Sequence, residues 1–178
     1  MNVLILTAST GGGHIRASNA LKSYFKEKDN AINVNVVDTF KYINPLLDKT
    51  VTNGYLYLAK KTPKLYGKLY DLTNKEHRLA NFVTRLNNIF ANKLLPLIDD
   101  FRPDVIITTH PFPTEMVSRL KSKGEINIPL ICIMTDYAPH KAWINKKVDA
   151  YIVANDDMVG KMINEGVDVN TIYPYGIP

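Results

Sequence analysis

A glycine-rich stretch between an apolar run and a helical run constrains this chain more than any other feature. Residues 3–6 (Val-Leu-Ile-Leu) predict a buried strand, and residues 14–28 predict an amphipathic helix. Between them lies Thr-Ala-Ser-Thr-Gly-Gly-Gly-His at 7–14. An alternating run over 32–37 predicts a second strand that ends at Asp38. Strand, glycine turn, helix and strand in this order form a βαβ unit, which requires a parallel sheet and a right-handed crossover.

The glycine turn differs from the two common phosphate-binding loops. The dinucleotide fingerprint Gly-x-Gly-x-x-Gly would need glycine where the chain has Arg16, and no Gly-Lys-Ser/Thr of a P-loop follows. One interpretation is a tight strand–helix turn in which His14 caps the helix. The other is a nest of backbone N–H groups beside a general base, His14. In the second interpretation, which the glycine content favours, the residues that make room for a ligand are Gly11, Gly12 and Gly13.

The rest of the chain predicts further parallel strands after a helical insertion over about 43–101. The helices expected in the insertion are 44–58, 63–72 and 79–101. Strands are then expected at 104–109, 130–134, 150–154 and 171–173, with helices at 113–123 and 156–165. The 178 residues suffice for one domain. We therefore predict an α/β fold, namely a Rossmann-like parallel sheet with helices on both faces and a helical insertion.

Composition and charge indicate the compartment and the kind of partner to expect. The single cysteine, Cys132, lies in an apolar run, which predicts a buried thiol and fits a reducing compartment. No run approaches the ~20 apolar residues of a membrane span, so the protein is expected to be cytoplasmic, or to be peripheral on a membrane without crossing it. The net charge is +5, and residues 55–78 hold six basic and two acidic side chains. This basic patch predicts an anionic surface as partner.

The basic patch leaves two interpretations open. A helix that carries Leu and Tyr on one arc, with lysines beside it, suits the interface of an anionic membrane. The same pattern suits a surface helix that packs by its Leu/Tyr stripe. Nucleic acid is not expected, because no basic and aromatic binding motif occurs elsewhere. The candidate membrane-binding residues are Lys60, Lys61, Lys64, Tyr66, Lys68 and Tyr70.

Polar residues follow several of the expected strands, where ligands bind in open parallel sheets. Thr109 and His110 follow the strand at 104–109, and Asp136 follows the strand at 130–134. Turn-forming roles for His110 and Asp136 remain alternatives to ligand binding. The sequence also leaves open whether His14 or Asp136 acts as the base.

The segment after Asp136 adds an imidazole and an indole. His140 and Trp143 lie within eight positions of Thr135. A carboxylate at this edge of the sheet can orient an imidazole and raise its basicity, and Trp143 offers an apolar wall. A zinc site from His14, His110 and His140 lacks the tight spacing of zinc ligands, so no metal and no cofactor are expected.

Four motifs support a resemblance to a known family. They are Leu-Thr-Ala-Ser-x-Gly-Gly-Gly-His-x-x-Ala-Ser at 6–18, Thr-His-Pro at 109–111, Thr-Asp-x-x-x-His-x-x-Trp at 135–143 and Gly-Ile-Pro at 176–178. On these motifs, essentially the whole chain resembles the N-terminal domain of the monogalactosyldiacylglycerol synthase and processive diacylglycerol glucosyltransferase family. The members of this family are inverting GT-B glycosyltransferases.

The resemblance implies transfer of a hexose from a UDP-sugar to diacylglycerol on the inner face of the cell membrane. It implies that His14 is the base, that Asp136 tunes His14 or contacts the acceptor, and that His140 and Trp143 lie on the acceptor side. A C-terminal domain that binds the nucleotide-sugar is expected to be missing from this chain, so the domain alone is expected to be inactive. A non-catalytic module that binds anionic lipid and a nucleotide-sugar epimerase of the same architecture remain alternatives.

Overall fold

The computed structural model describes residues 1–9, 12–43, 90–139 and 141–178. These residues form a six-stranded sheet in the order β2-β1-β3-β4-β5-β6, and every neighbouring pair is parallel. The strands are β1 (Asn2–Thr7), β2 (Asn33–Asp38), β3 (Val105–Thr108), β4 (Leu130–Ile133), β5 (Ala150–Ile152) and β6 (Ile172–Tyr173). The helices are α1 (Gly12–Lys28), α2 (Thr39–Ile43), α6 (Leu95–Phe101), α7 (Pro111–Ser122) and α8 (Asp156–Asn164), with short 3₁₀ turns η1 (Lys141–Trp143) and η2 (Val169–Thr171). The predicted α/β fold with a parallel sheet is confirmed.

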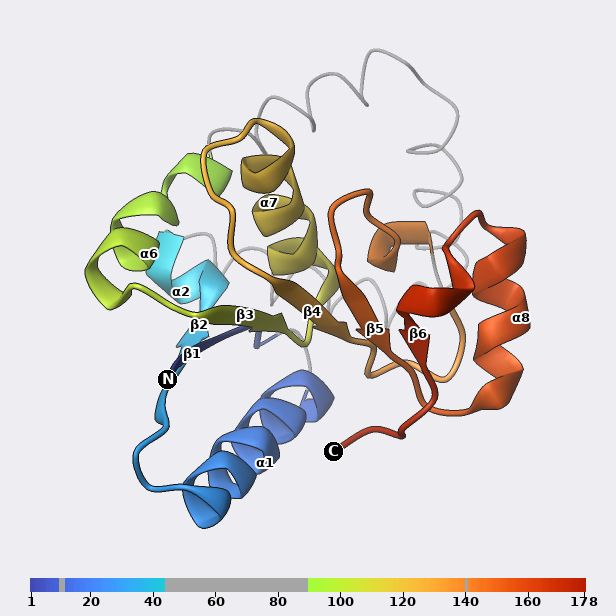
Figure 1. The fold of residues 1–178 in the computed structure, drawn as a ribbon, viewed down its shortest axis with the longest axis horizontal. Helices are drawn as coiled ribbons and strands as arrows, with labels where there is room; N and C mark the ends of the chain where they lie inside the picture. Colours follow the sequence, from blue (N-terminus) through green and yellow to red (C-terminus); the bar gives the residue numbers. More distant parts are fainter. Residues whose placement is uncertain (10–11, 44–89, 140) are drawn as a thin grey trace, which may run out of the picture.

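Helices cover both faces of the sheet. They have to, because successive side chains of β1 point to opposite faces and Val3 to Thr7 are all buried. Val3 and Ile5 point to one face, where they share a core cluster with Phe25 of α1. Leu4 and Leu6 point to the other face, into a larger core that includes side chains of α6, α7 and α8. Figure 1 shows α1 on one side of the sheet and α6 and α7 on the opposite side.

The strand order places the switch of direction between β1 and β3. The chain runs outward from β1 to β2, then returns to the other side of β1 and continues through β3 to β6. The connections that follow the neighbouring strands β1 and β3 therefore lead in opposite directions along the sheet. Parallel sheets of this kind bind ligands in the crevice between two such connections. The residues predicted to form the site follow these two strands and β4.

Two local differences from the sequence predictions have clear causes. The short helix α2 was not expected; it begins directly after Asp38, whose Oδ1 accepts a hydrogen bond from the backbone N–H of Lys41 at 3.3 Å. The prediction of one unbroken helix over 79–101 is wrong in its described part. A turn at residues 93–94 precedes α6, because Pro96 has no N–H to continue a preceding helix. Residues 44–89, which hold the other predicted helices and all six candidate membrane-binding residues, lie outside the described part.

The remaining helices end as predicted. Gly124 follows α7 with a φ of 74°, and Gly166 follows α8 with a φ of 87°, a left-handed conformation that glycine adopts without steric cost. Within the described ranges of the chain, no helix combines the length and apolar character needed to cross a bilayer.

Candidate functional site

The imidazole of His14 lies at the centre of the site, in the first turn of α1. Its Nδ1 lies 2.7 Å from the backbone oxygen of Thr109, after β3, and 2.7 Å from Oγ1 of Thr135, after β4. A carbonyl oxygen can only accept, so Nδ1 carries the hydrogen, and the Thr135 hydroxyl oxygen is its second acceptor. In the neutral ring the unshared electron pair is therefore on Nε2. Nε2 is the atom that can take a proton from a substrate.

Thr109 holds both the side chain and the backbone of His14. Its carbonyl oxygen accepts from the imidazole, while its buried hydroxyl lies 3.2 Å from the carbonyl oxygen of His14. That hydroxyl also contacts Oγ1 of Thr7 and Oγ of Ser18, each at 2.9 Å. Ser18 in turn donates to the carbonyl oxygen of His14 at 3.0 Å. These contacts join the ends of β1 and β3 to the first turn of α1 and fix the position of the base.

His110 lies beside His14 as a second, differently bonded imidazole. The centroids of the His14 and His110 rings are 4.6 Å apart in an edge-to-face arrangement, and the centroid of the Phe40 ring lies 6.0 Å from that of His110. His110 caps α7, where its Nδ1 accepts the N–H of Phe112 at 3.1 Å. Burial, together with the nearby charge of His14, lowers the pKa of His110 from 6.5 to about 3. His110 is therefore a neutral neighbour at physiological pH, and its ring hydrogen is on Nε2.

Trp143 and Asp136 form a pair on the β4 side of the site. The indole is 0% exposed, and its ring centroid lies 6.1 Å from that of His14. Its Nε1–H donates to Oδ2 of Asp136 at 2.8 Å. The carboxylate thus bonds to Trp143, whereas the oxygens at Nδ1 of His14 belong to Thr109 and Thr135. A catalytic role of Asp136 stays a prediction.

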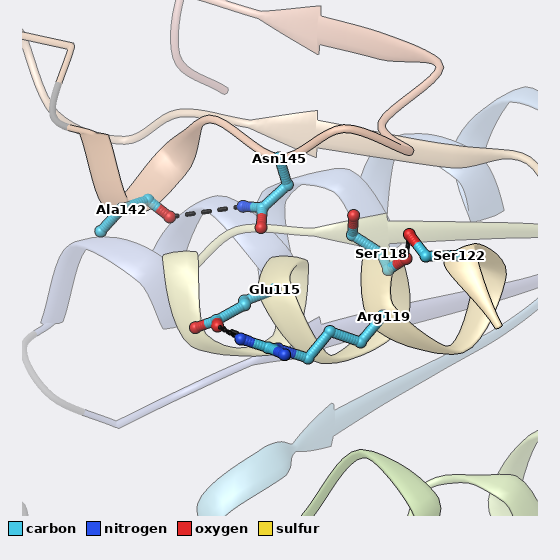
Figure 2. A network of polar contacts seen from close by, with 6 residues as sticks. All are labelled: Glu115, Ser118, Arg119, Ser122, Ala142 and Asn145. Carbon is cyan, nitrogen blue, oxygen red and sulfur yellow. Dashed lines mark hydrogen bonds and ion pairs between the residues drawn. The ribbon is translucent and has the colours of Figure 1, made fainter. Parts of the chain in front are cut away.

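The segment that carries Trp143 is anchored on α7 and β5. The hydroxyl of Tyr151 accepts from the backbone N–H of Asn145 at 2.8 Å and donates to its carbonyl at 3.0 Å. Oγ of Ser118, on α7, accepts the N–H of Lys147 at 3.2 Å. Figure 2 shows the bond from Asn145 to Ala142 above α7. The wall formed by Trp143 is therefore fixed by contacts on two sides.

Gly12 and Gly13 leave open space above the first turn of α1. Both are exposed and lie in the helix, and neither is among the described residues with a positive φ. A methyl group built on Gly13 would meet no atom within 4 Å, and one on Gly12 would meet only the tip of Arg16, at 3.8 Å. Neither backbone conformation nor internal packing requires glycine here. The space that these glycines leave lies outside the protein, where a ligand can approach the helix N-terminus.

Most of the predicted site residues in the described part lie at one edge of the sheet. His14, Thr109, His110 and Trp143 are joined by the contacts above. Gly11 and His140 lie outside the described residues, so the zinc hypothesis, which needs His140, is not tested. Across the described ranges no cluster of metal-ligating side chains occurs. Thr135 was not predicted to be a partner of His14; the signal that could have found it is its place two residues after the end of β4, in the Thr-Asp motif.

Comparison with known families shows which proteins this chain is related to. Residues 14–178 match the family model described as monogalactosyldiacylglycerol (MGDG) synthase. The chain belongs to the MGDG synthase family. Members named processive diacylglycerol beta-glucosyltransferase, from Bacillus thuringiensis and Bacillus anthracis, are each 34% identical to it over 180 residues. The alignment covers 99% of this chain and 44% of either relative, so the chain spans less than half the length of these MGDG synthase family members.

Solved structures show the same fold at low sequence identity. The apo form of a lipopolysaccharide outer core galactosyltransferase, WaaB, matches with a TM-score of 0.53 and 14% identity over 97% of this chain and 44% of its own. The UDP-GlcNAc 2-epimerase of Neisseria meningitidis, bound to UDP-GlcNAc, matches with a TM-score of 0.54 and 14% identity over 97% of this chain and 46% of its own. The chain described here, a galactosyltransferase and an epimerase therefore share this fold.

Proposed function

We propose that this chain is the acceptor-binding half of an inverting glycosyltransferase that transfers a hexose from a UDP-sugar to diacylglycerol at a membrane surface. The observation that carries the proposal is the fixed imidazole of His14. Its Nδ1–H is held by two oxygens, at the edge of the sheet where β1 and β3 diverge. Membership of the MGDG synthase family and the names of the relatives supply the substrate class.

The proposed reaction needs one base and one stabilised leaving group. Nε2 of His14 takes the proton of the acceptor hydroxyl as that oxygen forms a bond to the anomeric carbon of the sugar. The bond between the anomeric carbon and the diphosphate breaks, and the nucleoside diphosphate leaves with the electron pair. Attack from the face opposite the leaving group inverts the anomeric configuration. The positive end of the α1 dipole and the guanidinium of Arg16, near Gly12, favour negative charge in this region.

Substitution of the base tests the proposal. In the intact protein that contains this chain, His14→Gln removes the proton acceptor, and a loss of about 10²–10⁴-fold in kcat is expected. The assay follows radiolabelled sugar from UDP-glucose and UDP-galactose into diacylglycerol, and the anomeric coupling constant of the product shows whether the configuration is inverted. Asn19→Ala, on the exposed side of the same helix, is the matched control. Full activity of His14→Gln, or retention of configuration, would refute the proposal.

The proposed membrane contact rests on the sequence of residues 55–78. Sedimentation with anionic and neutral liposomes tests it, using a variant in which Lys60, Lys61, Lys64 and Lys68 are changed to Glu. A control variant carries the same change of charge at Lys26, Lys28, Lys146 and Lys161, which lie on the exposed surface. Binding to anionic vesicles that only the first variant loses supports the proposal. An equal loss of vesicle binding in both variants would show that net charge alone causes the binding. Absence of binding by the unmodified protein would favour a soluble acceptor.

A further inference from the structure

The hydrogen-bonding of the His14 ring assigns a role to Thr135, the first residue of the motif at 135–143, which had no role of its own in the sequence predictions. We propose that Thr135 is a positioning residue: its hydroxyl oxygen and the carbonyl oxygen of Thr109 together hold the His14 imidazole in the Nδ1–H form, with the unshared pair on Nε2. The relevance of this to catalysis rests on the proposed function, in which Nε2 is the base. The hydrogen-bond arrangement itself does not depend on that function.

The geometry of the two contacts supports this role. Thr109 O and Thr135 Oγ1 both lie 2.7 Å from Nδ1, which is short for a hydrogen bond from nitrogen. The two acceptors follow adjacent strands, since β3 pairs with β4 in parallel, so the ring is held from two directions. With a single acceptor, the ring can still turn through a range of side-chain torsion angles. A second acceptor restricts this rotation and so determines where Nε2 points.

The site uses neutral oxygens where other enzymes use a carboxylate. In a Ser-His-Asp triad a buried aspartate accepts from Nδ1–H and stabilises the imidazolium. Here the carboxylate of Asp136 accepts from the indole of Trp143, and the Nδ1–H of His14 meets a carbonyl and a hydroxyl. Among the residues that the structure describes, the titratable group in direct ring contact with His14 is His110, which caps α7. Orientation of the base therefore depends on hydroxyl and backbone oxygens.

The neighbouring imidazole offers an internal comparison. Nδ1 of His110 accepts the N–H of Phe112, so His110 carries its hydrogen on Nε2. The two rings, 4.6 Å apart, are therefore predicted to be opposite tautomers. Nitrogen NMR distinguishes the two forms, because a protonated ring nitrogen and an unprotonated one resonate at well-separated frequencies.

The first experiment determines the tautomer of His14. Intact protein labelled with ¹⁵N at histidine is recorded at a pH where the ring is neutral, and the His14 signals are assigned by their loss in His14→Gln. The expected result is a protonated Nδ1 and an unprotonated Nε2 for His14, with the reverse for His110. A His14 ring that carries its hydrogen on Nε2 would overturn the inference, whatever the activity of the protein. This measurement needs no substituted threonine to fold.

The second experiment removes the Thr135 hydroxyl while keeping its shape. In Thr135→Val the Nδ1–H loses one acceptor, so its exchange with water is expected to rise and kcat to fall about 3- to 10-fold with KM unchanged. Thr135→Ser keeps the hydroxyl and is expected to restore both values. Thr171→Val is the matched control, because Thr171 lies in η2 and its hydroxyl donates to the backbone oxygen of Asp168 at 2.7 Å.

Distinct outcomes separate this inference from the proposed function. A Thr135→Val protein with unchanged Nδ1–H exchange and unchanged kcat would overturn the positioning role. If Thr135→Val releases the ring while His14→Gln keeps full activity, the positioning role stands and His14 as base is refuted. A fall in kcat that serine fails to restore and that occurs without a change in Nδ1–H exchange would show that the hydroxyl does not act through the His14 ring, and would also overturn the inference.

Discussion

The partly buried, neutral imidazole of His110 makes the stability of this protein depend on pH in a way that can be calculated. Its pKa is about 3 in the folded state, because burial and the charge of His14 disfavour protonation, against 6.5 when unfolded. Between these two values the unfolded state binds more protons than the folded state, so stability is greatest above pH 6.5 and falls as the pH falls. From about pH 7.5 to about pH 5, linkage gives a loss of ~2 kcal/mol from this residue alone.

A variant that keeps the cap but cannot titrate isolates this contribution. In His110→Asn the side-chain oxygen can accept the N–H of Phe112, as Nδ1 of His110 does, and asparagine is a favourable N-cap. The free energy of unfolding is measured by urea titration at several pH values for both proteins. The difference between the two curves cancels the other titrating groups.

The expected difference has a definite shape. Relative to the asparagine variant, the unmodified protein should lose about 1.3 kcal/mol per pH unit near pH 5 and almost nothing above about pH 7.5. Parallel curves across this range would refute the reasoning, since they would show that His110 takes up a proton equally well in both states. A difference that grows toward high pH would have the wrong sign and would refute it equally.

Three further predictions concern other residues of the site and core. Gly13→Ala should stabilise the fold by up to about 0.5–1 kcal/mol, because the methyl group meets no atom and alanine favours a helix. Sugar transfer should nevertheless fall, because the methyl group occupies the space that a ligand would need. A variant in which stability and sugar transfer both rise would argue against ligand approach at this turn. Asp136→Ala should cost about 1–3 kcal/mol of stability in chemical denaturation, because it leaves the buried Nε1–H of Trp143 without its acceptor, whereas Asp136→Asn should retain most of it. Cys132, whose pKa burial raises to about 12, should react with a thiol reagent at pH 8 only at the rate of unfolding; fast labelling of the native protein would contradict its buried position.

Much of the fold could be predicted from the sequence because its apolar runs are short and separated by strong turn signals. Residues 3–6 and 130–134 are continuous apolar runs, typical of strands buried on both faces. Gly124 and Gly166 marked helix ends correctly, because left-handed backbone conformations favour glycine. The predicted helix 79–101 was wrong in its described part. The helical spacing of apolar residues continues across Pro96, but proline has no N–H to continue the helical hydrogen bonds there.

For the candidate site, the sequence predicts which segments lie together, but it does not predict which atoms form the hydrogen bonds. Parallel strands bring their carboxyl ends to one edge, so His14, Thr109 and Trp143 could be placed together from the order of elements. The sequence could not show that Asp136 bonds to Trp143 while Thr135 meets His14. These two residues are adjacent, and only the direction of each side chain decides which partner it contacts.

The long separation between His14 and its acceptors has a consequence for how the protein is made. Nδ1 of His14 bonds to oxygens that follow it by 95 and 121 residues in the chain. At ~5–20 residues per second, a ribosome adds the last of these acceptors roughly 6 to 24 s after the histidine. A nascent chain that ends after β3 already contains the base and its glycines but lacks the second acceptor. Assembly of this site therefore cannot be completed until 121 further residues have been added after its central histidine.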